Sequence, residues 1–125
     1  MRKPGENPQP ISHTADEIPV DLWHEWASPV WMSINQTNVL NGRQAKEDKD
    51  EKHISVLQLD LIERCIKLWS NPNDIVFDPF GGIGSTPYMA LKLGRRALAS
   101  ELKESYYKQM IENCRNAQII QETLF

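Results

Sequence analysis

The sequence has no excess of basic residues. Its 14 Lys and Arg stand against 17 Asp and Glu, so the formal net charge is −3. Proteins that bind nucleic acid usually carry a basic face. An affinity for DNA would therefore have to come from a local patch or from a region outside this sequence. Four basic residues of the chain are interpreted as solvated surface charges rather than phosphate contacts: Arg43, Arg95, Arg96 and Lys103.

Cysteines and long apolar runs are also scarce. Cys65 and Cys114 have no CxxC or His/Cys spacing, which argues against a metal site and predicts buried, reduced thiols. No apolar run approaches the ~18 residues that a membrane span requires, and no signal peptide is visible. We expect a cytoplasmic protein with no membrane partner and, at 125 residues, at most one domain.

Residues 1–52 are expected to form an irregular arm followed by a charged loop. Four of the eight prolines fall within residues 1–22, so neither a helix nor a central strand is expected there. Residues 21–41, DLWHEWASPVWMSINQTNVLN, hold three of the four tryptophans. This segment is expected to pack on something, in part on protein outside this sequence. Residues 42–52, GRQAKEDKDEK, predict a solvated, mobile loop.

Residues 53–125 alternate helix and strand signals. Apolar residues at three- and four-residue spacing predict an amphipathic helix from about residue 56 to 70; they are Leu59, Ile62, Cys65, Ile66 and Trp69. The short run IVFD, residues 75–78, predicts a buried strand, because four residues are too few for a helix. A helix with Thr86 as N-cap and Pro87 as its first residue is predicted to end at Gly94.

A second strand is predicted over residues 96–101 and a further helix over 105–118. One face of that helix is expected to carry Tyr107, Met110, Ile111, Cys114 and Gln118. The order predicts an α/β fold with two parallel strands joined by a helical crossover. Because two parallel strands cannot bury themselves, we expect an incomplete sheet that belongs to, or pairs with, a larger one.

A glycine-rich turn, DPFGGIGST (residues 78–86), follows the first strand. Its glycines allow positive φ and a close approach of a ligand to the backbone, and the next helix points free N–H groups at the turn. A P-loop would need a lysine after Gly84, where Ser85 and Thr86 stand. A GxGxxG dinucleotide fingerprint would need glycine in place of Pro87. Both phosphate-binding interpretations therefore fail.

Two acidic residues end the two predicted strands. Asp78 stands beside the turn, where a carboxylate repels phosphate but suits an ammonium group. Glu101 follows 23 residues later, at the spacing where a carboxylate binds ribose hydroxyls. A ligand with an ammonium end and a ribose is S-adenosylmethionine. The alternative is that Asp78 only caps the turn and Glu101 is a solvated strand end.

These residues resemble a known family. DPFGGIGST is similar to the cofactor motif D-P-F-x-G-x-G-S/T-T of DNA methyltransferases that methylate exocyclic amino groups. The stretch EKHISVLQLDLIERCIKLWSNPNDIV resembles the segment upstream of that motif, GRRALASELKESYYKQ resembles the second-strand region, and SPVWMSINQTNVLN resembles phage-type members. The resemblance implies a partial Rossmann-like, S-adenosylmethionine-dependent methyltransferase fold. It also implies a site-specific adenine-N6 or cytosine-N4 DNA methyltransferase.

The resemblance assigns roles residue by residue. Asp78 would bind the methionine ammonium group, Glu101 would hold the ribose and Phe80 would line the cofactor pocket. Gly82 and Gly84 would admit the cofactor to the backbone. Three weaker candidates near the methionine end are His53, Gln58 and Ser85.

No residues that would bind the methyl acceptor are found. The family's D/N/S-P-P-Y/F/W motif binds the amino group and stacks the flipped base, and this sequence has no Pro-Pro. The nearest string is SPVW, residues 28–31, whose Ser28 and Trp31 are interpreted as structural; Trp23 and Trp26 are expected in the core. We therefore assign no catalytic residue. We expect the C-terminal, cofactor-binding piece of a methyltransferase, inactive alone, from a truncated gene, a prophage remnant or a split enzyme.

The expected partners follow from that interpretation. DNA would be contacted through the full-length enzyme or a partner chain, and self-association or pairing with a catalytic half is expected. Two other function classes stay open. One is a non-catalytic interaction module that pairs through its sheet edge and tryptophan segment. The other is a methyltransferase half that acts on RNA or a small molecule.

Overall fold

The computed structural model describes residue 5 and residues 9–40 and 56–123, with side chains described as far as Ile119. Within these residues the elements are α1 (Val20–Trp26), α2 (Leu59–Trp69), β1 (Ile75–Asp78), α3 (Ser85–Lys92), β2 (Arg96–Ala99) and α4 (Glu104–Thr123). The loop predicted over 42–52 and the boundary predicted at 52/53 lie outside the described residues, so both stay predictions.

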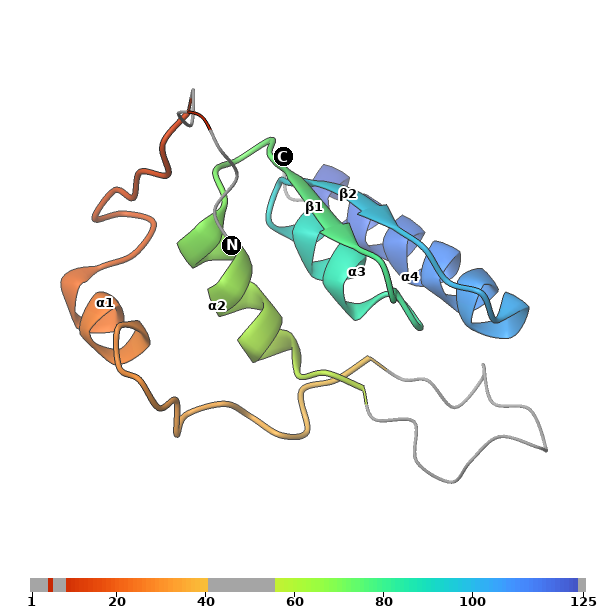
Figure 1. The fold of residues 1–125 in the computed structure, drawn as a ribbon, viewed down its shortest axis with the longest axis horizontal. Helices are drawn as coiled ribbons and strands as arrows, with labels where there is room; N and C mark the ends of the chain where they lie inside the picture. The colour runs from red at the N-terminus through yellow and green to blue at the C-terminus, as the bar shows by residue number, and fades with distance from the viewer. Residues whose placement is uncertain (1–4, 6–8, 41–55, 124–125) are drawn as a thin grey trace.

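The two strands form the predicted parallel pair. Ile75 is paired with Arg96 and Asp78 with Ala99, and α3 is the crossover between them. In Figure 1, α3 and α4 lie behind this two-stranded sheet, and α2 stands beside α3. The α/β order predicted from residue 56 onward is therefore confirmed. β2 ends two residues earlier than predicted, at Ala99, and α4 extends to Thr123.

The core lies between α2 and α3. Leu59, Ile62 and Ile66 of α2 pack with Met89 and Ala90 of α3, which confirms the amphipathic character of α2. Three residues predicted on apolar helix faces are instead exposed: Trp69, Tyr107 and Gln118. In α4 the buried side chains are Gln109, Met110 and Ala117, because this stripe faces α3 and the glycine turn.

One face of the sheet is uncovered in the described part of the chain. Ile75, Phe77 and Leu98 are each 59% exposed, whereas Val76 and Ala97 of the opposite face pack on the core. The prediction of a buried strand is therefore wrong for β1. A parallel strand is buried on both faces only when a layer covers each of them, and the described helices cover one.

An apolar hollow of about 420 Å³ lies beside β1. It is lined largely by side chains of α2 and β1, among them Cys65, Trp69 and Ile75. Trp69 and Cys65 are exposed because they face this open side of β1 rather than α3. Cys65 is thus not a buried thiol, and Cys114 is half-buried; both are free.

The ends of α3 differ in how well the sequence predicted them. The helix begins at Ser85 with Gly84 as N-cap, not at Pro87 with Thr86 as N-cap. Pro87 is tolerated at the third position because N–H groups of the first turn have no partner within the helix. At the other end Gly94 has φ 72°, and the N–H groups of Gly94 and Arg95 donate to the carbonyls of Leu91 and Ala90. This is the predicted glycine stop.

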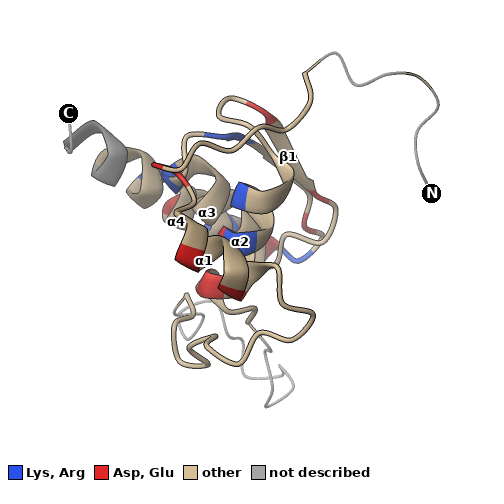
Figure 2. Ribbon diagram, turned by 90° about the vertical axis from the view of Figure 1, so that its left-hand side faces the viewer, with Lys and Arg blue, Asp and Glu red and all other residues tan. Residues whose placement is uncertain are grey.

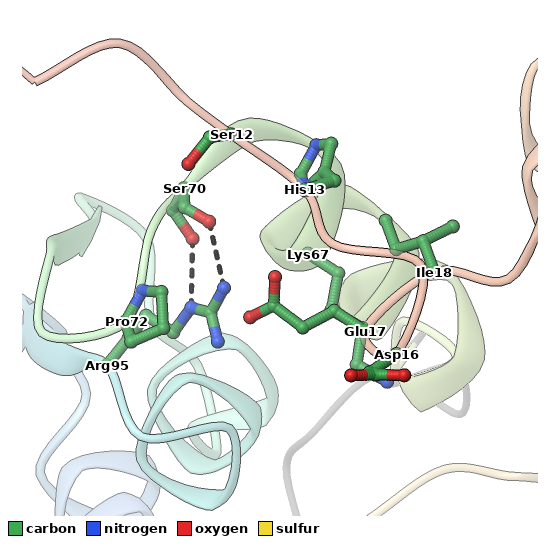
Figure 3. Close-up of a pocket in the computed structure, with 9 residues that line it drawn as sticks. All are labelled: Ser12, His13, Asp16, Glu17, Ile18, Lys67, Ser70, Pro72 and Arg95. Carbon is green, nitrogen blue, oxygen red and sulfur yellow. Dashed lines mark hydrogen bonds between the residues drawn. The ribbon is translucent and has the colours of Figure 1, made fainter.

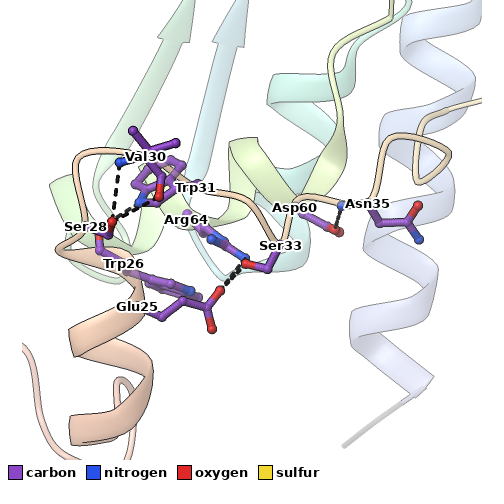
Figure 4. Close-up of polar contacts among 9 residues, drawn as sticks. All are labelled: Glu25, Trp26, Ser28, Val30, Trp31, Ser33, Asn35, Asp60 and Arg64. Carbon is purple, nitrogen blue, oxygen red and sulfur yellow. Dashed lines mark hydrogen bonds and ion pairs between the residues drawn. The ribbon is translucent and has the colours of Figure 1, made fainter.

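The first part of the chain contains a helix that the prolines did not predict. α1 carries Trp26, which is 7% exposed, and α2 presents Arg64 to it. The Arg64 guanidinium lies 5.6 Å from the Trp26 ring and 5.5 Å from the Trp31 ring and pairs with Glu25 at 3.0 Å (Figure 4). The expectation that this segment packs on something is met by α2, and its packing on protein outside this sequence stays a prediction. Trp23, by contrast, is 45% exposed and is not a core residue.

Three further hydrogen bonds tie the first 40 residues to α2. The Asp60 carboxylate accepts the backbone N–H of Asn35 at 2.9 Å and a hydrogen bond from the Asn38 side chain. These two bonds, the backbone one first, hold the pKa of Asp60 below its ordinary value. The carbonyl of Asn38 also accepts the N–H of Leu59, the first residue of α2.

Arg95 is not the solvated charge that the sequence predicted. Its guanidinium donates to the Ser70 hydroxyl at 3.2 Å and the Ser70 carbonyl at 2.8 Å (Figure 3). It also donates to the Leu93 carbonyl at 2.7 Å. Burial lowers the pKa of Arg95 from its ordinary value. Arg95 therefore joins the C-terminal ends of α2 and α3. It lines a hollow of about 250 Å³ together with residues 12, 13 and 16–18 of the arm.

Basic and acidic residues both occur on the side of the molecule that carries α1 and α2. Figure 2 views this side and shows blue and red segments on these helices and their neighbours. None of the described helices is long and apolar enough to span a membrane.

We predict that Gly94→Ala lowers the free energy of unfolding by about 1 kcal/mol, because alanine is strained at the positive φ of this helix stop. Urea denaturation followed by circular dichroism measures the loss. Lys92→Ala, at an exposed position of the same helix, serves as the control and is expected to stay within about 0.5 kcal/mol of the unchanged protein. Equal stabilities of the two variants would contradict the assigned role of Gly94.

Candidate functional site

The candidate site begins where β1 ends. Asp78 is the last residue of β1, and one oxygen of its carboxylate, Oδ1, accepts the N–H of Phe80 at 3.0 Å. No hydrogen bond is found for the other oxygen, Oδ2, among the described residues. The carboxylate thus caps the turn with one oxygen, as the simpler interpretation expected, and keeps the second oxygen for another donor.

The end of β2 lies against the same turn. Ser100 donates its N–H to the Asp78 carbonyl at 3.1 Å, and its carbonyl accepts the Gly81 N–H at 2.8 Å. Glu101 follows, and its carboxylate accepts the N–H of Gly82 at 2.8 Å and the N–H of Lys103 at 2.9 Å. These bonds place the Glu101 carboxylate against the glycine turn, and its predicted role at the ribose stays a prediction. Glu101 is a fixed, partly buried acceptor rather than a solvated strand end.

The three glycines of the turn serve different purposes. A Cβ on Gly84, whose φ is 91°, would lie 2.7 Å from Cγ of Met110 and 3.1 Å from its Cα. A Cβ on Gly81 would lie 2.9 Å from the Met110 sulfur. These two glycines let α4 approach the turn. Gly82 also has positive φ, 54°, but a Cβ there would meet nothing within 4 Å, so its open side is available to a ligand.

A cavity of about 200 Å³ opens beside the turn and the start of α3. Four of the predicted site residues line it: Asp78, Phe80, Gly82 and Ser85. Ser85 is 8% exposed, whereas the Phe80 ring at the rim is 87% exposed.

Three other predicted site residues do not line the cavity. Gly84 lies against Met110 of α4. Glu101 is joined to the cavity lining by the hydrogen bond that its carboxylate accepts from the Gly82 N–H. Gln58 is the N-cap residue of α2, where its carbonyl accepts the N–H of Ile62 at 3.2 Å. His53 lies outside the described residues.

Six of the ten residues that line the cavity were not predicted as site residues. The missed side chains are Val56, Leu57, Ile83, Thr86 and Tyr106, besides the backbone of Gly81. Val56 and Leu57 come immediately before α2, where no periodicity marks them. Tyr106 had a usable signal, because it stands four residues before Met110 and so shares its helix face. The Lys103 ammonium lies over the Tyr106 ring, 4.4 Å from the ring centroid.

The lining residues are acidic or neutral. Asp78 is the one charged side chain among the described residues that line the cavity, and no Lys or Arg is present there. The described residues contain no group of His, Cys, Asp and Glu side chains able to hold a metal ion. The charge of Asp78 suits the cationic end of a ligand.

The SPVW string has a structural role. The Ser28 hydroxyl donates to the Val30 carbonyl at 3.0 Å, and the Trp31 indole N–H donates to the Trp26 carbonyl at 2.9 Å (Figure 4). With its ring also against Arg64, Trp31 cannot serve as a platform for a flipped base without leaving this packing. The structural interpretation of Ser28 and Trp31 agrees with these contacts.

Known proteins with similar sequences and folds are DNA methyltransferases. A family model described as DNA methylase matches residues 1–112. The type II methyltransferase M1.MboII of Moraxella bovis is 32% identical over 119 residues, 87% of this chain and 44% of that protein. The type II methyltransferase M.HindIII of Haemophilus influenzae is 28% identical over 111 residues, 86% of this chain and 36% of that protein.

A solved structure extends the likeness to the fold. TTHA0409 from Thermus thermophilus, solved in complex with S-adenosyl-L-methionine, is 27% identical, with a TM-score of 0.67 over 94% of this chain and 41% of its own. The predicted partial Rossmann-like fold of S-adenosylmethionine-dependent methyltransferases is therefore confirmed. The chain spans less than half the length of each of these three proteins.

We predict that Gly84→Ala destabilises the chain by at least about 2 kcal/mol, since the added methyl group would overlap Met110 at a left-handed backbone position. Gly82→Ala should cost only about 1 kcal/mol, because it adds backbone strain without a clash. Thermal and urea unfolding of both variants measure the difference. A Gly82→Ala variant as unstable as Gly84→Ala would refute this division of roles.

Proposed function

The chain belongs to the DNA methylase family, and we propose that it forms the S-adenosylmethionine half-site of a DNA amino-methyltransferase. The observation that carries the proposal is the hydrogen bond from the Gly82 N–H to the Glu101 carboxylate. It joins the two strand ends that bear acids, beside a cavity that Asp78 lines. Ligands of open α/β sheets bind at this carboxyl edge of the strands.

Asp78 fits the ammonium group of the cofactor. Its Oδ1 accepts the Phe80 N–H, Oδ2 remains as an acceptor, and Asp78 lines the cavity. A hydrogen bond between an ammonium group and a carboxylate is among the stronger kinds in proteins. No described basic side chain lines the cavity to compete for the carboxylate.

Glu101 fits the ribose. Each of its oxygens accepts one backbone N–H, from Gly82 or from Lys103, which fixes the plane of the carboxylate. A carboxylate has about four acceptor positions, so two remain for a pair of hydroxyl groups. Gly82 lies between the two acids, and its open side lets the cofactor approach the backbone.

The cavity is the size of part of a binding site. Its volume of about 200 Å³ is below the roughly 300–1,000 Å³ typical of small-molecule pockets. Phe80, at its rim, is 87% exposed. We propose that the remaining wall comes from protein beyond the described residues, either another segment or a partner chain.

When bound, the cofactor supplies an electrophilic methyl group on its sulfonium sulfur. The residues of this chain bind the cofactor and orient it. The acceptor is proposed to be the exocyclic amino group of adenine or cytosine in DNA, flipped out of the helix. The residues that bind the base would come from another segment or from a partner chain, like the missing wall of the cavity. The whole enzyme is proposed to be of the phage type and to act on DNA in the cytoplasm.

A second candidate is a non-catalytic pairing module. The observation that favours it is the uncovered sheet face, with Ile75, Phe77 and Leu98 each 59% exposed. Such a module would bind a protein partner without needing the cofactor. The RNA and small-molecule alternatives share the proposed cofactor site and differ only in the methyl acceptor.

We predict that the purified chain binds S-adenosylmethionine and that Asp78→Asn weakens the binding at least about tenfold. The asparagine keeps an oxygen for the Phe80 N–H but loses the charge that attracts the ammonium group. Isothermal titration calorimetry of the two proteins provides the measurement.

Asp21→Asn is the matched control for this titration. It makes the same charge change on the exposed surface of α1 and should leave the affinity unchanged within about twofold. No saturable binding by a well-folded chain would overturn the proposed cofactor site and favour the pairing module. Equal affinities of Asp78→Asn and the unchanged chain would overturn the role of Asp78.

We further predict that the chain alone transfers no methyl group to DNA, because its sequence lacks the D/N/S-P-P-Y/F/W motif that binds the base in the family it resembles. Transfer of tritium from labelled S-adenosylmethionine to duplex DNA, RNA and free nucleosides tests this, with M1.MboII on DNA as the positive control. Robust labelling of DNA without another protein would show that the acceptor site lies within this chain. Labelling of RNA or nucleosides alone would replace DNA as the substrate.

A further inference from the structure

The carbonyl of Ile83 needs a donor from outside α3. Ile83 is 4% exposed, so its carbonyl has little access to water. The first carbonyl that accepts an N–H of α3 is that of Gly84, bound by Tyr88 at 2.9 Å. Four residues after Ile83 the chain has Pro87, which carries no N–H. A buried carbonyl without a donor would be costly.

Asn113 of α4 supplies this donor. Its side-chain Nδ2 donates to the Ile83 carbonyl at 2.8 Å. The other end of the amide, Oδ1, accepts a hydrogen bond from Nε2 of Gln109 at 3.3 Å, and Gln109 is 9% exposed. Gln109 thereby fixes which end of the Asn113 amide faces the turn.

The same face of α4 touches the turn a second time. Met110 precedes Asn113 by three residues and lies against Gly81 and Gly84. The peptide bond between Ile83 and Gly84 is planar, so a bond to the Ile83 carbonyl also sets the direction of the Gly84 N–H. That N–H donates to the Gly81 carbonyl at 2.8 Å and closes the turn around Gly82.

We propose that Asn113 is a positioning residue of the cofactor site. It holds the Ile83–Gly84 peptide so that Gly82 presents its backbone to the cofactor and its N–H to Glu101. This inference rests on the proposed function, because it concerns the shape of the same half-site. Asn113 does not line the cavity, so it acts through the turn and not by contact with the ligand.

Asn113→Asp tests the role with almost no change in volume. The carboxylate has no donor for the Ile83 carbonyl and places a negative oxygen against it. We expect S-adenosylmethionine to bind at least about tenfold more weakly in calorimetry. Asn116→Asp is the matched control, since it makes the same charge change at an exposed position of α4 and should stay within about twofold.

A second readout needs no cofactor. Amide hydrogen exchange measured by NMR should become at least about tenfold faster at Gly82 and Gly84 in Asn113→Asp. Exchange at Ile62 and Ile66 in α2 should not change, which separates a loosened turn from general destabilisation. Gln109→Glu should act in the same direction, because its carboxylate attracts Nδ2 of Asn113 away from the turn. If Asn113→Asp fails to fold, Gln109→Glu carries both measurements.

The outcomes separate this inference from the proposed function. Binding by the unchanged chain with equal affinity in Asn113→Asp and Gln109→Glu would overturn the positioning role and leave the cofactor site intact. No binding by the unchanged chain would overturn both. Weaker binding together with faster exchange confined to the turn would support the positioning role, whereas faster exchange throughout α2 as well would overturn it.

Discussion

The candidate site depends on one carboxylate held between two backbone N–H groups. Glu101 accepts from Gly82 in the glycine turn and from Lys103 at the start of the next segment, and so ties the end of β2 to the end of β1. Ser100 adds two backbone bonds to the same junction. Because the strands are parallel, their carboxyl ends meet at one edge, and these bonds convert that edge into a shaped cavity.

The long helix α4 supports this junction. Met110 fills the space that Gly81 and Gly84 leave open, and Asn113 binds the Ile83 carbonyl. Two of the three glycines are therefore required by the packing of a helix, and only Gly82 keeps an open side for a ligand. A motif that resembles a single ligand-binding unit in the sequence thus combines a proposed cofactor contact, at Gly82, with a helix contact, at Gly81 and Gly84.

The first 40 residues and the sheet differ in whether their apolar surface is covered. Arg64 lies between Trp26 and Trp31, so α1 and the segment after it are packed on α2. The outer face of the sheet has no such cover among the described residues, and Ile75, Phe77 and Leu98 stay exposed. The apolar surface of α2 is therefore covered within the described chain, whereas that of the outer sheet face is not.

The sequence by itself determined what depends on close neighbours and on topology: the amphipathic α2, the glycine stop at Gly94, the parallel strand order and the shared edge of Asp78 and Glu101. It could not determine the start of α3 at Ser85, the helix α1, the exposure of Trp69 or the buried hydrogen bonds of Arg95. The tertiary structure alone decided these features. It alone also showed that Gly82 has an open side whereas Gly84 lies against Met110. The physical reason is that burial and hydrogen-bond partners depend on which elements meet, and those elements lie far apart in the sequence.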